Sequence, residues 1–508
     1  MTLIAAAPRV RIQQGTAVIL LTMSLGVLIA QIDTSVVNLA VKAIGTNLGA
    51  GVTALQWVVD SYNLVYASLL LTAGTLADLY GRRLIFAVGI ALFTLGSLVC
   101  GLAPNAAVLI AGRAVAGLGA ALEIPTSLAI LAVAYPETRE RTRALGVWAS
   151  CNGLAFIIGP TLGGALVEYV GWRSIFLLII PICALVLVLT ATSVPESKSS
   201  KGRRLDAPGQ ALAIAGLGAL ALAVIQGPQW GWESIGSMAA FVGSALSAVL
   251  FVLRQRDSDS ALMPLTMFKN RVFSASLGIA AAMTFGMYAM LFLTPLYLQA
   301  GRGDGALQAA IQLLPMSVMF VIVSQLSGKI ANAYGPRLPM TLGMAMMGIG
   351  LFMLALIPIS NSLLLIEVAL LVIGCGLGLN TGPVNAVAVA NVPAARSGTA
   401  SGLVNTARMV GATLGVAVLG AIFAVFTGGS GGHVVAGLSP AFIVGGIGEM
   451  LGAVAAFTFI RRDSHDPVVD LRSDARAPSA LSRARQSDCG RPVVWAAAAE
   501  RTSRFCKQ

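Results

Sequence analysis

Two related stretches lie far apart in the chain, "GTLADLYGRR" at residues 74–83 and "GKIANAYGPR" at residues 328–337. Each stretch follows a long apolar run and ends in a basic residue. A stretch that returns in the same setting indicates an internally duplicated chain with two related halves. The identical pairs are Gly74 and Gly328, Ala77 and Ala331, Tyr80 and Tyr334, Gly81 and Gly335, and Arg83 and Arg337.

The composition around these stretches is that of a membrane protein. Of the 508 residues, 57% are hydrophobic and 11% are charged, whereas soluble domains carry about 25% charged residues. A chain with so little charge must be solvated by lipid. The net charge of +12 could suggest nucleic-acid binding, but the basic residues lie in short loops between apolar runs, as in cytoplasmic loops of membrane proteins. We therefore expect a lipid bilayer around the chain and no nucleic-acid partner.

The apolar runs predict an all-α membrane protein. About 20 apolar residues cross the hydrocarbon core as a helix. The first run lacks a small-residue cleavage site, so we expect a retained helix rather than a signal peptide. We predict 14 transmembrane helices, at residues 17–40, 57–77, 84–103, 107–133, 144–167, 172–194, 210–228, 236–254, 272–298, 306–330, 338–358, 361–390, 400–427 and 438–460.

Loop charge predicts the orientation of these helices. With the N-terminus inside the cell, every inner loop carries Lys or Arg, whereas the outer loops carry few basic residues. The cytoplasmic bias of Lys and Arg therefore places both chain ends inside, which requires an even number of spans. Twelve spans would also be even, but fourteen spans keep "SKGRR" (200–204) and "RQRDSD" (254–259) on the same side. We expect a multi-pass protein of the cytoplasmic membrane.

The repeat divides the chain into two six-helix halves with two extra helices between them. Further pairs support the duplication, since Arg143 and Arg396 lie in corresponding inner loops, and "GPTLGGA" (159–165) resembles "GATLGVA" (411–417). The predicted parts are a cytoplasmic N-terminus at 1–16, one half at 17–194, a linker with the extra helices at 195–271, the other half at 272–460 and a disordered cytoplasmic tail at 461–508.

Three motifs resemble one family. The stretch at 74–83 is similar to the loop signature of the major facilitator superfamily, and "RAVAGLGAA" (113–121) and "GLAFIIGPTLGG" (153–164) resemble its span-four and span-five motifs. "QIDTSVVNLAV" and "QWVVDSYNLVYASLLL" resemble spans one and two of the fourteen-helix drug:H⁺ antiporters, including actinomycete antibiotic exporters. The resemblance runs from about residue 15 to 460 and implies proton-coupled efflux of drugs or antibiotics by alternating access. The alternative is import or export of an endogenous small metabolite on the same fold.

The resemblance implies that the repeated loops form a cytoplasmic gate that latches the two halves. Asp78 can pair with a neighbouring helix end or cap a helix, and Gly74 and Gly81 allow tight turning and close packing. The alternative is an ordinary charged loop that only sets topology. The candidate gate residues are Gly74, Asp78, Gly81, Arg82, Arg83, Gly328, Gly335 and Arg337.

The fifth predicted helix carries a smooth face of glycines against which another helix can pack closely. Pro160 removes a backbone donor there and can bend the helix. The resemblance implies that this antiporter motif packs between the halves and disfavours a leak, whereas generic glycine packing is the alternative. The motif residues are Gly153, Gly159, Pro160, Gly163 and Gly164.

Charged residues inside the predicted spans are candidates for proton coupling. A charge at the bilayer centre costs about 2.5–3.5 kcal/mol on insertion scales and usually faces the bundle interior. Asp33 lies roughly 10 Å and Arg113 roughly 9 Å below the outer surface, by helix rise. The matched depths predict a direct or water-bridged pair, which the resemblance places at the proton-coupling site. The alternative is a static ion pair that only joins two helices.

Glu123, near the middle of the fourth span, is a further candidate for proton coupling or for attracting a cationic drug. Its helix face holds Ala116, Gly119, Ala120 and Ser127, which are small or polar and could line a cavity. The alternative is a protonated, hydrogen-bonded Glu at a helix contact. Other candidates for a substrate cavity, each of which could equally join helices by polar contacts, are Asp60, Asn63, Asn152, Gln325, Asn380, Asn385 and Arg408.

The remaining expectations concern partners. The sequence has no phosphate-binding loop, no metal-ligand cluster and no nucleophile–base arrangement, so we expect a transporter rather than an enzyme or an ATP-driven pump. We expect no metal or cofactor, with the proton gradient as the energy source. The expected partners are protons and a lipophilic or cationic small-molecule drug, and the resemblance implies a functional monomer.

Overall fold

The computed structural model describes residues 7–198, 205–257, 262–360, 362–393, 396–427 and 435–461. Helices joined by short turns make up these residues, and no strand occurs among them. The predicted all-α fold is therefore confirmed for the described part of the chain. The predicted tail at 461–508 lies outside the described residues except for its first residue, as does the start of the predicted N-terminus.

The helices follow the predicted runs closely. The first group comprises α1 (Ala7–Leu48), α2 (Val52–Tyr80), α3 (Arg82–Gly101), α4 (Ala106–Ala134), α5 (Thr138–Tyr169), α6 (Ser174–Leu177) and α7 (Ile179–Ser193). Two helices follow, α8 (Ala207–Trp230) and α9 (Ile235–Asp257). The second group comprises η1 (Leu265–Lys269), α10 (Arg271–Leu296), η2 (Tyr297–Gly301), α11 (Ala306–Tyr334), α12 (Arg337–Leu354), α13 (Ile357–Ser360), α14 (Leu363–Ala390), α15 (Ser397–Thr427) and α16 (Leu438–Phe459).

Thirteen helices among the described residues are long and apolar enough to cross a membrane. The remaining long helix, α2, has 29 residues but is less apolar, because Asp60, Ser61 and Asn63 lie within it. Each of the 14 predicted runs therefore coincides with a helix of membrane length, with α6 and α7, and likewise α12 and α13, treated as one span each. The main difference is at α1, which begins earlier and ends later than predicted.

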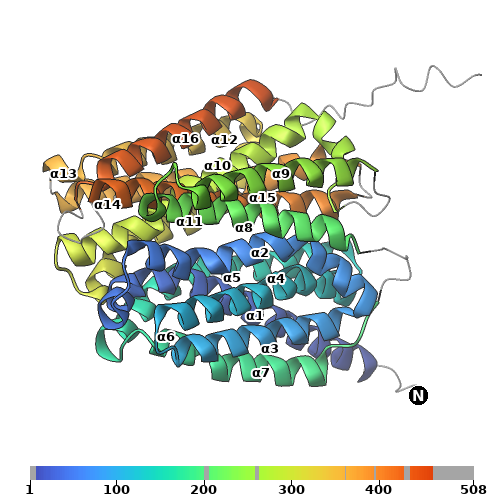
Figure 1. Cartoon of the computed structure of the whole chain (residues 1–508). Coiled ribbons are helices and arrows are strands. Elements are labelled where there is room, and N and C mark those ends of the chain that lie inside the picture. The colour runs from blue at the N-terminus through green and yellow to red at the C-terminus, as the bar shows by residue number, and fades with distance from the viewer. Residues whose placement is uncertain are drawn as a thin grey trace, which may run out of the picture. The chain divides into compact units, whose positions relative to one another are not determined.

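The duplication is visible in the helix packing. In the first group α1 packs on α5, α2 and α3 both pack on α4, and α3 packs on α7. In the second group α10 packs on α15, α11 and α12 both pack on α14, and α12 packs on α16. Glycines bring helices into backbone contact in both groups, since a Cβ on Gly96 would lie 2.5 Å from Ala116 N, and one on Gly376 would lie 2.4 Å from Gly343 O. Figure 1 shows the long helices of each group lying side by side.

The two additional helices lie at the edge of this arrangement. Helix α8 packs on both α2 and α15, where Ala221 and Ile225 join a small apolar cluster with Ala417 and Ala421. Helix α9 packs on α8, and Ser244 Oγ donates to the carbonyl of Gly216 at 2.9 Å. The outer face of α9 exposes a row of apolar side chains that suits contact with lipid, formed by Ile235, Met238, Val242, Leu246 and Val249.

Candidate functional site

Asp33 of α1 and Arg113 of α4 form a buried ion pair. Arg113 Nη1 lies 2.5 Å from Asp33 Oδ2, and both side chains are at most 2% exposed. Arg113 also donates from Nε to the carbonyl of Val58 at 3.1 Å and lies 4.4 Å above the ring of Tyr62. The pair that matched depth predicts is therefore present, and it joins α1, α2 and α4. Because each charge compensates the other, removing either one leaves its partner buried and unpaired.

Glu123 of α4 is enclosed rather than open to a cavity. Its side chain is 1% exposed, and Oε1 has no hydrogen-bond partner. A Cβ on Gly26 of α1 would lie 2.5 Å from that oxygen and 3.1 Å from the ring of Phe86. The glycine therefore makes room for the carboxyl group between helices.

The helix face around Glu123 does not line a cavity as predicted. Ala116 and Gly119 lie in backbone contact with α3, because a Cβ on Gly119 would lie 2.5 Å from Phe93 N. Ser127 instead accepts a hydrogen bond from Trp148 Nε1 of α5 at 3.1 Å. The prediction is wrong for Ala116 and Gly119 because small residues on a transmembrane helix serve close helix packing as readily as they line a space.

Glu449 of α16 is a buried acid that the sequence reasoning did not single out. It is fully buried and has no ion-pair partner among the described residues, and its carboxyl group lies against the backbone of Gly286. A Cβ on Gly286 of α10 would lie 2.4 Å from its Oε1. Its position inside the last predicted span could have identified Glu449 from the sequence, since intramembrane acids are rare.

The weaker cavity candidates on α2 and α14 are buried polar groups. Asp60 is fully buried and neither of its carboxylate oxygens is hydrogen-bonded in the described structure. Asn63 is 1% exposed, and its amide nitrogen likewise lacks a partner there. Asn380 donates to the carbonyl of Gly376 in its own helix at 3.2 Å, and Asn385 is half-buried. The side chain of Asn152 lies outside the described residues.

Arg408 lies on α15, which packs on helices of both groups, α2 and α10. It is half-buried, and Nη2 donates to the carbonyl of Thr381 at 2.8 Å. Arg408 interacts electrostatically with Tyr288 of α10 and with Tyr66 of α2. Tyr66 also interacts with Glu123. Because α15 packs on both α2 and α10, Arg408, Tyr66 and Tyr288 lie on adjoining helices, and we call these three residues the Arg408 cluster.

The first predicted gate loop makes its described contacts mainly within the first helix group. Asp78 pairs with Arg82 at 3.0 Å, and Arg83 Nη2 donates to the carbonyl of Ala191 at 2.8 Å. Glu196, which the sequence reasoning missed, accepts from the backbone N–H groups of Arg83 at 3.1 Å and Leu84 at 3.2 Å. A carboxylate at the first turn of α3 is stabilised by the helix dipole. The loop is therefore anchored to the segment after α7.

The glycines of the two gate loops differ in what they do. Gly81 and Gly335 have φ values of +118° and +77°, so both provide the predicted turns. The prediction of close packing at Gly74 is wrong, because no neighbouring atom lies within 4 Å of a Cβ built there, and the same holds for Gly328. In the second loop, the Arg337 guanidinium lies 4.0 Å from the centre of the Phe457 ring of α16.

The glycines of α5 join both helix groups. A Cβ on Gly163 would lie 2.7 Å from the side chain of Val36 on α1, and Gly159 lies against Ser35 of the same helix. On the other side, a Cβ on Gly164 would lie 2.7 Å from Ala310 of α11. Gly153 faces Val321 of α11 less tightly, and Pro160 lies inside the helix. The predicted smooth face is present and lies at the seam between α1 and α11.

At the predicted outer end, the two helix groups are joined by hydrogen bonds. Lys42 Nζ donates to the carbonyl of Gln299 at 2.6 Å, and Gln299 Nε2 donates to the carbonyl of Leu39 at 2.9 Å. Glu168 at the end of α5 accepts from the backbone N–H of Leu307 in the first turn of α11 at 2.8 Å. Closure at this end is thus built from specific polar contacts.

Towards the predicted cytoplasmic end, α5 and α11 expose residues that would otherwise face each other. Gly146, Ala149 and Ser150 of α5 are exposed, and so are Gln325 and Gly328 of α11. The described contacts between α5 and α11 thus lie nearer the predicted outer end, at Gly153 and Gly164.

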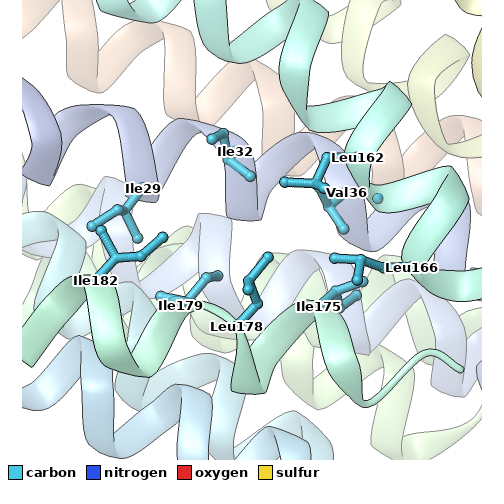
Figure 2. Close-up of a pocket in the computed structure, with 10 residues that line it drawn as sticks. Ile29, Ile32, Val36, Leu162, Leu166, Ile175, Leu178, Ile179 and Ile182 are labelled. Carbon is cyan, nitrogen blue, oxygen red and sulfur yellow. The ribbon is translucent and has the colours of Figure 1, made fainter. Parts of the chain in front are cut away.

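A groove lined by apolar side chains lies between α1, α5, α6 and α7 (Figure 2). Ile32 and Val36 of α1 lie on one side of it, and Ile175, Leu178 and Ile179 lie on the opposite side. A second apolar pocket lies between α8 and α15 and includes Trp232. Neither pocket has a charged residue in its lining, so both suit lipid tails better than a polar ligand. Among the described residues, no cluster of His, Cys, Asp and Glu could hold a metal ion.

Comparison with known proteins agrees with this architecture. The model of the Major Facilitator Superfamily matches residues 23–416. The chain is 41% identical over 407 residues to "Multidrug resistance protein Stp" of Mycobacterium tuberculosis, covering 80% of this chain and 76% of that protein. It is 34% identical to the "Methylenomycin A resistance protein" of Bacillus subtilis, covering 87% of this chain and 94% of that protein.

Solved structures share the fold at low sequence identity. The D-xylose-proton symporter superimposes with a TM-score of 0.64 at 16% identity, covering 88% of this chain and 98% of that one. A bacterial homologue of the lysosomal transporter Spinster gives a TM-score of 0.65 at 17% identity, covering 89% and 97%. The family match, the relatives and these folds indicate a multi-pass membrane transporter rather than an enzyme. The chain belongs to the major facilitator superfamily.

Proposed function

We propose that this protein is a proton-coupled exporter of small-molecule drugs or antibiotics in the cytoplasmic membrane. The names of its relatives, which include a multidrug resistance protein and antibiotic resistance proteins, support drug efflux. It works as a monomer with both termini in the cytoplasm, and it uses the proton gradient rather than a cofactor. Its substrates are lipophilic or cationic compounds that enter from the cytoplasmic side.

The proposed movement is rocking of residues 17–194 against 272–460, with residues 195–271 as the linker. The glycine face of α5 supports this movement, because smooth helix surfaces can slide past one another. Hydrogen bonds from Lys42, Gln299 and Glu168 close the predicted outer end. Rocking must break these bonds and bring the gate loops near Asp78 and Arg337 towards each other.

The observation that carries the proposal is the buried Asp33–Arg113 pair. A proton on Asp33 removes the charge that holds Arg113, so the cost of separating α1 from α4 falls. Protonation can thus favour one arrangement of the helices, and loss of the proton the other. Glu123, enclosed in the same helix group, is the proposed second proton carrier.

The decisive experiment is drug-driven proton release by the Asp33→Asn variant in proteoliposomes. We expect release to be abolished, because Asn cannot exchange a proton, while the variant remains inserted in the membrane. Reconstituted protein is quantified to confirm insertion. Drug and proton exchange at the wild-type rate would contradict the assignment of Asp33.

A further inference from the structure

Arg408 is a cation in the middle of the helix bundle. It lies roughly 16 Å along α15 from the first residue of that helix, by helix rise. Its neighbour Met409 packs against the apolar core of the first helix group. Helix α15 packs on α2 of that group and on α10 of the second group, and the backbone carbonyl of Arg408 accepts from Thr284 Oγ1 of α10 at 2.5 Å. The guanidinium group therefore lies where the two groups meet.

No acid compensates this cation in the described structure. The ion pairs among the described residues do not include Arg408, and Nε is buried without a hydrogen-bond partner. The one described side-chain hydrogen bond of the guanidinium goes to a backbone carbonyl, that of Thr381. Arg113, in contrast, has the carboxylate of Asp33 at 2.5 Å. An intramembrane cation without a counter-ion is costly, and a ligand of opposite charge would lower that cost.

We propose that Arg408 binds the anionic group of the transported compound, so that the Arg408 cluster selects aromatic acids. A guanidinium group recognises carboxylates through parallel hydrogen bonds, which suits the unpartnered Nε together with a terminal nitrogen. Tyr66 of α2 and Tyr288 of α10, both at most 8% exposed, lie on the helices that pack on α15, and each carries an aromatic ring and a hydroxyl donor. This inference rests on the proposed export function and adds aromatic acids to its lipophilic or cationic substrates.

The alternative role of Arg408 is to brace α15 against α14 through the carbonyl of Thr381. A brace would affect all substrates equally, whereas an anion site would affect acids only. The two roles are therefore separated by substrate selectivity rather than by total activity.

The test compares uptake of anionic and cationic aromatic probes into inverted membrane vesicles energised by a proton gradient. The anions are nalidixate and fluorescein, and the cations are ethidium and crystal violet. We expect the wild type to transport the anions and Arg408→Gln to lower their uptake about tenfold or more, the loss expected for one charged hydrogen bond. Arg408→Lys keeps the charge but loses the paired geometry, so its anion uptake falls between the two.

Arg396 provides the matched control, because it immediately precedes α15 but is exposed and donates to Thr266 Oγ1 at 3.0 Å. Arg396→Gln removes the same charge outside the cluster and is expected to leave anion and cation uptake unchanged. Retained cation uptake by Arg408→Gln shows that this variant folds. Equal loss of anion and cation uptake in Arg408→Gln, or cation uptake alone by the wild type, overturns the proposal. If the wild type moves neither class, the export function itself is contradicted.

Discussion

The two helix groups share one packing pattern but treat their buried charges differently. In the first group, Asp33 and Arg113 compensate each other at 2.5 Å. In the second group, Glu449 and Arg408 are not paired in the described structure, either with each other or with another charged residue. Paired charges hold helices together, whereas unpaired charges remain available to a proton or an ionic ligand. Duplication has thus preserved the scaffold while the chemistry of its interior has diverged.

The largest loss of stability is expected when one partner of the Asp33–Arg113 ion pair is removed. Asp33→Asn leaves a guanidinium that cannot lose its proton, so we expect a loss of about 3–5 kcal/mol of stability. Arg113→Gln should cost less, because the remaining carboxylate can take up a proton. Thermal unfolding of the purified variants in detergent measures both, and the double variant should recover part of the loss. Additive losses in the double variant would show that the pair contributes no coupling.

Close packing between the two helix groups, where α5 meets α11, can be tested at Gly164. Gly164→Val places methyl groups against Ala310 and the carbonyl of Ala306, so we expect a loss of about 1–3 kcal/mol from overpacking. Drug transport should fall with it, because closure at the predicted outer end is disturbed. Gly146→Val on the same helix is the control, since no atom lies within 4 Å of a Cβ there. Similar losses from both variants would mean that the cost is general to α5 rather than specific to the seam.

Glu449→Gln tests the unpaired buried acid of the second helix group. Burial without a counter-ion favours the uncharged acid, which Gln imitates in size and polarity. We therefore expect only a small change in thermal stability, well below the loss expected for Asp33→Asn. Protons released per drug molecule should also match the wild type. A lower proton count with normal stability would instead make Glu449 a proton carrier, like the role proposed for Glu123.

A small effect is expected at the anchor of the first gate loop. Glu196→Gln removes the negative charge at the start of α3, which is worth about 0.3–1 kcal/mol at an exposed helix end. The loss should shrink as salt concentration rises, since exposed charges are screened. Thermal unfolding at low and high salt checks this, and a loss independent of salt would rule out the helix dipole as its cause.

Hydropathy and turn chemistry were sufficient for much of the fold. A long apolar run has one stable form in lipid, so the 14 runs could be located from the sequence, and Gly81 and Gly335 marked two turns. The depth of a residue along its helix also follows from its position, which is why Asp33 and Arg113 could be matched.

The direction in which each side chain points could not be derived in the same way. Rotation of a helix about its axis depends on its neighbours, so the sequence allows Ala116 and Gly119 to line a cavity although they pack on α3. The role of Glu196 depends on where the segment after α7 returns, which residue patterns alone do not specify. Gly74 was expected to pack closely because glycine often does, yet the space beside it is open.

The position of α8 has a mechanical consequence. Gln210 of α8 donates to the carbonyl of Ser68 at 2.7 Å and is also hydrogen-bonded to Thr72, so α8 is tied to α2. Towards α15 it presents Ala221 and Ile225, which meet the alkyl side chains of Ala417 and Ala421. If the two groups rock as proposed, α8 travels with α2, and shear occurs along its boundary with α15. The extra helix pair then slides against α15 in each transport cycle. Because alanine side chains are small, those at this boundary offer little steric resistance to the movement.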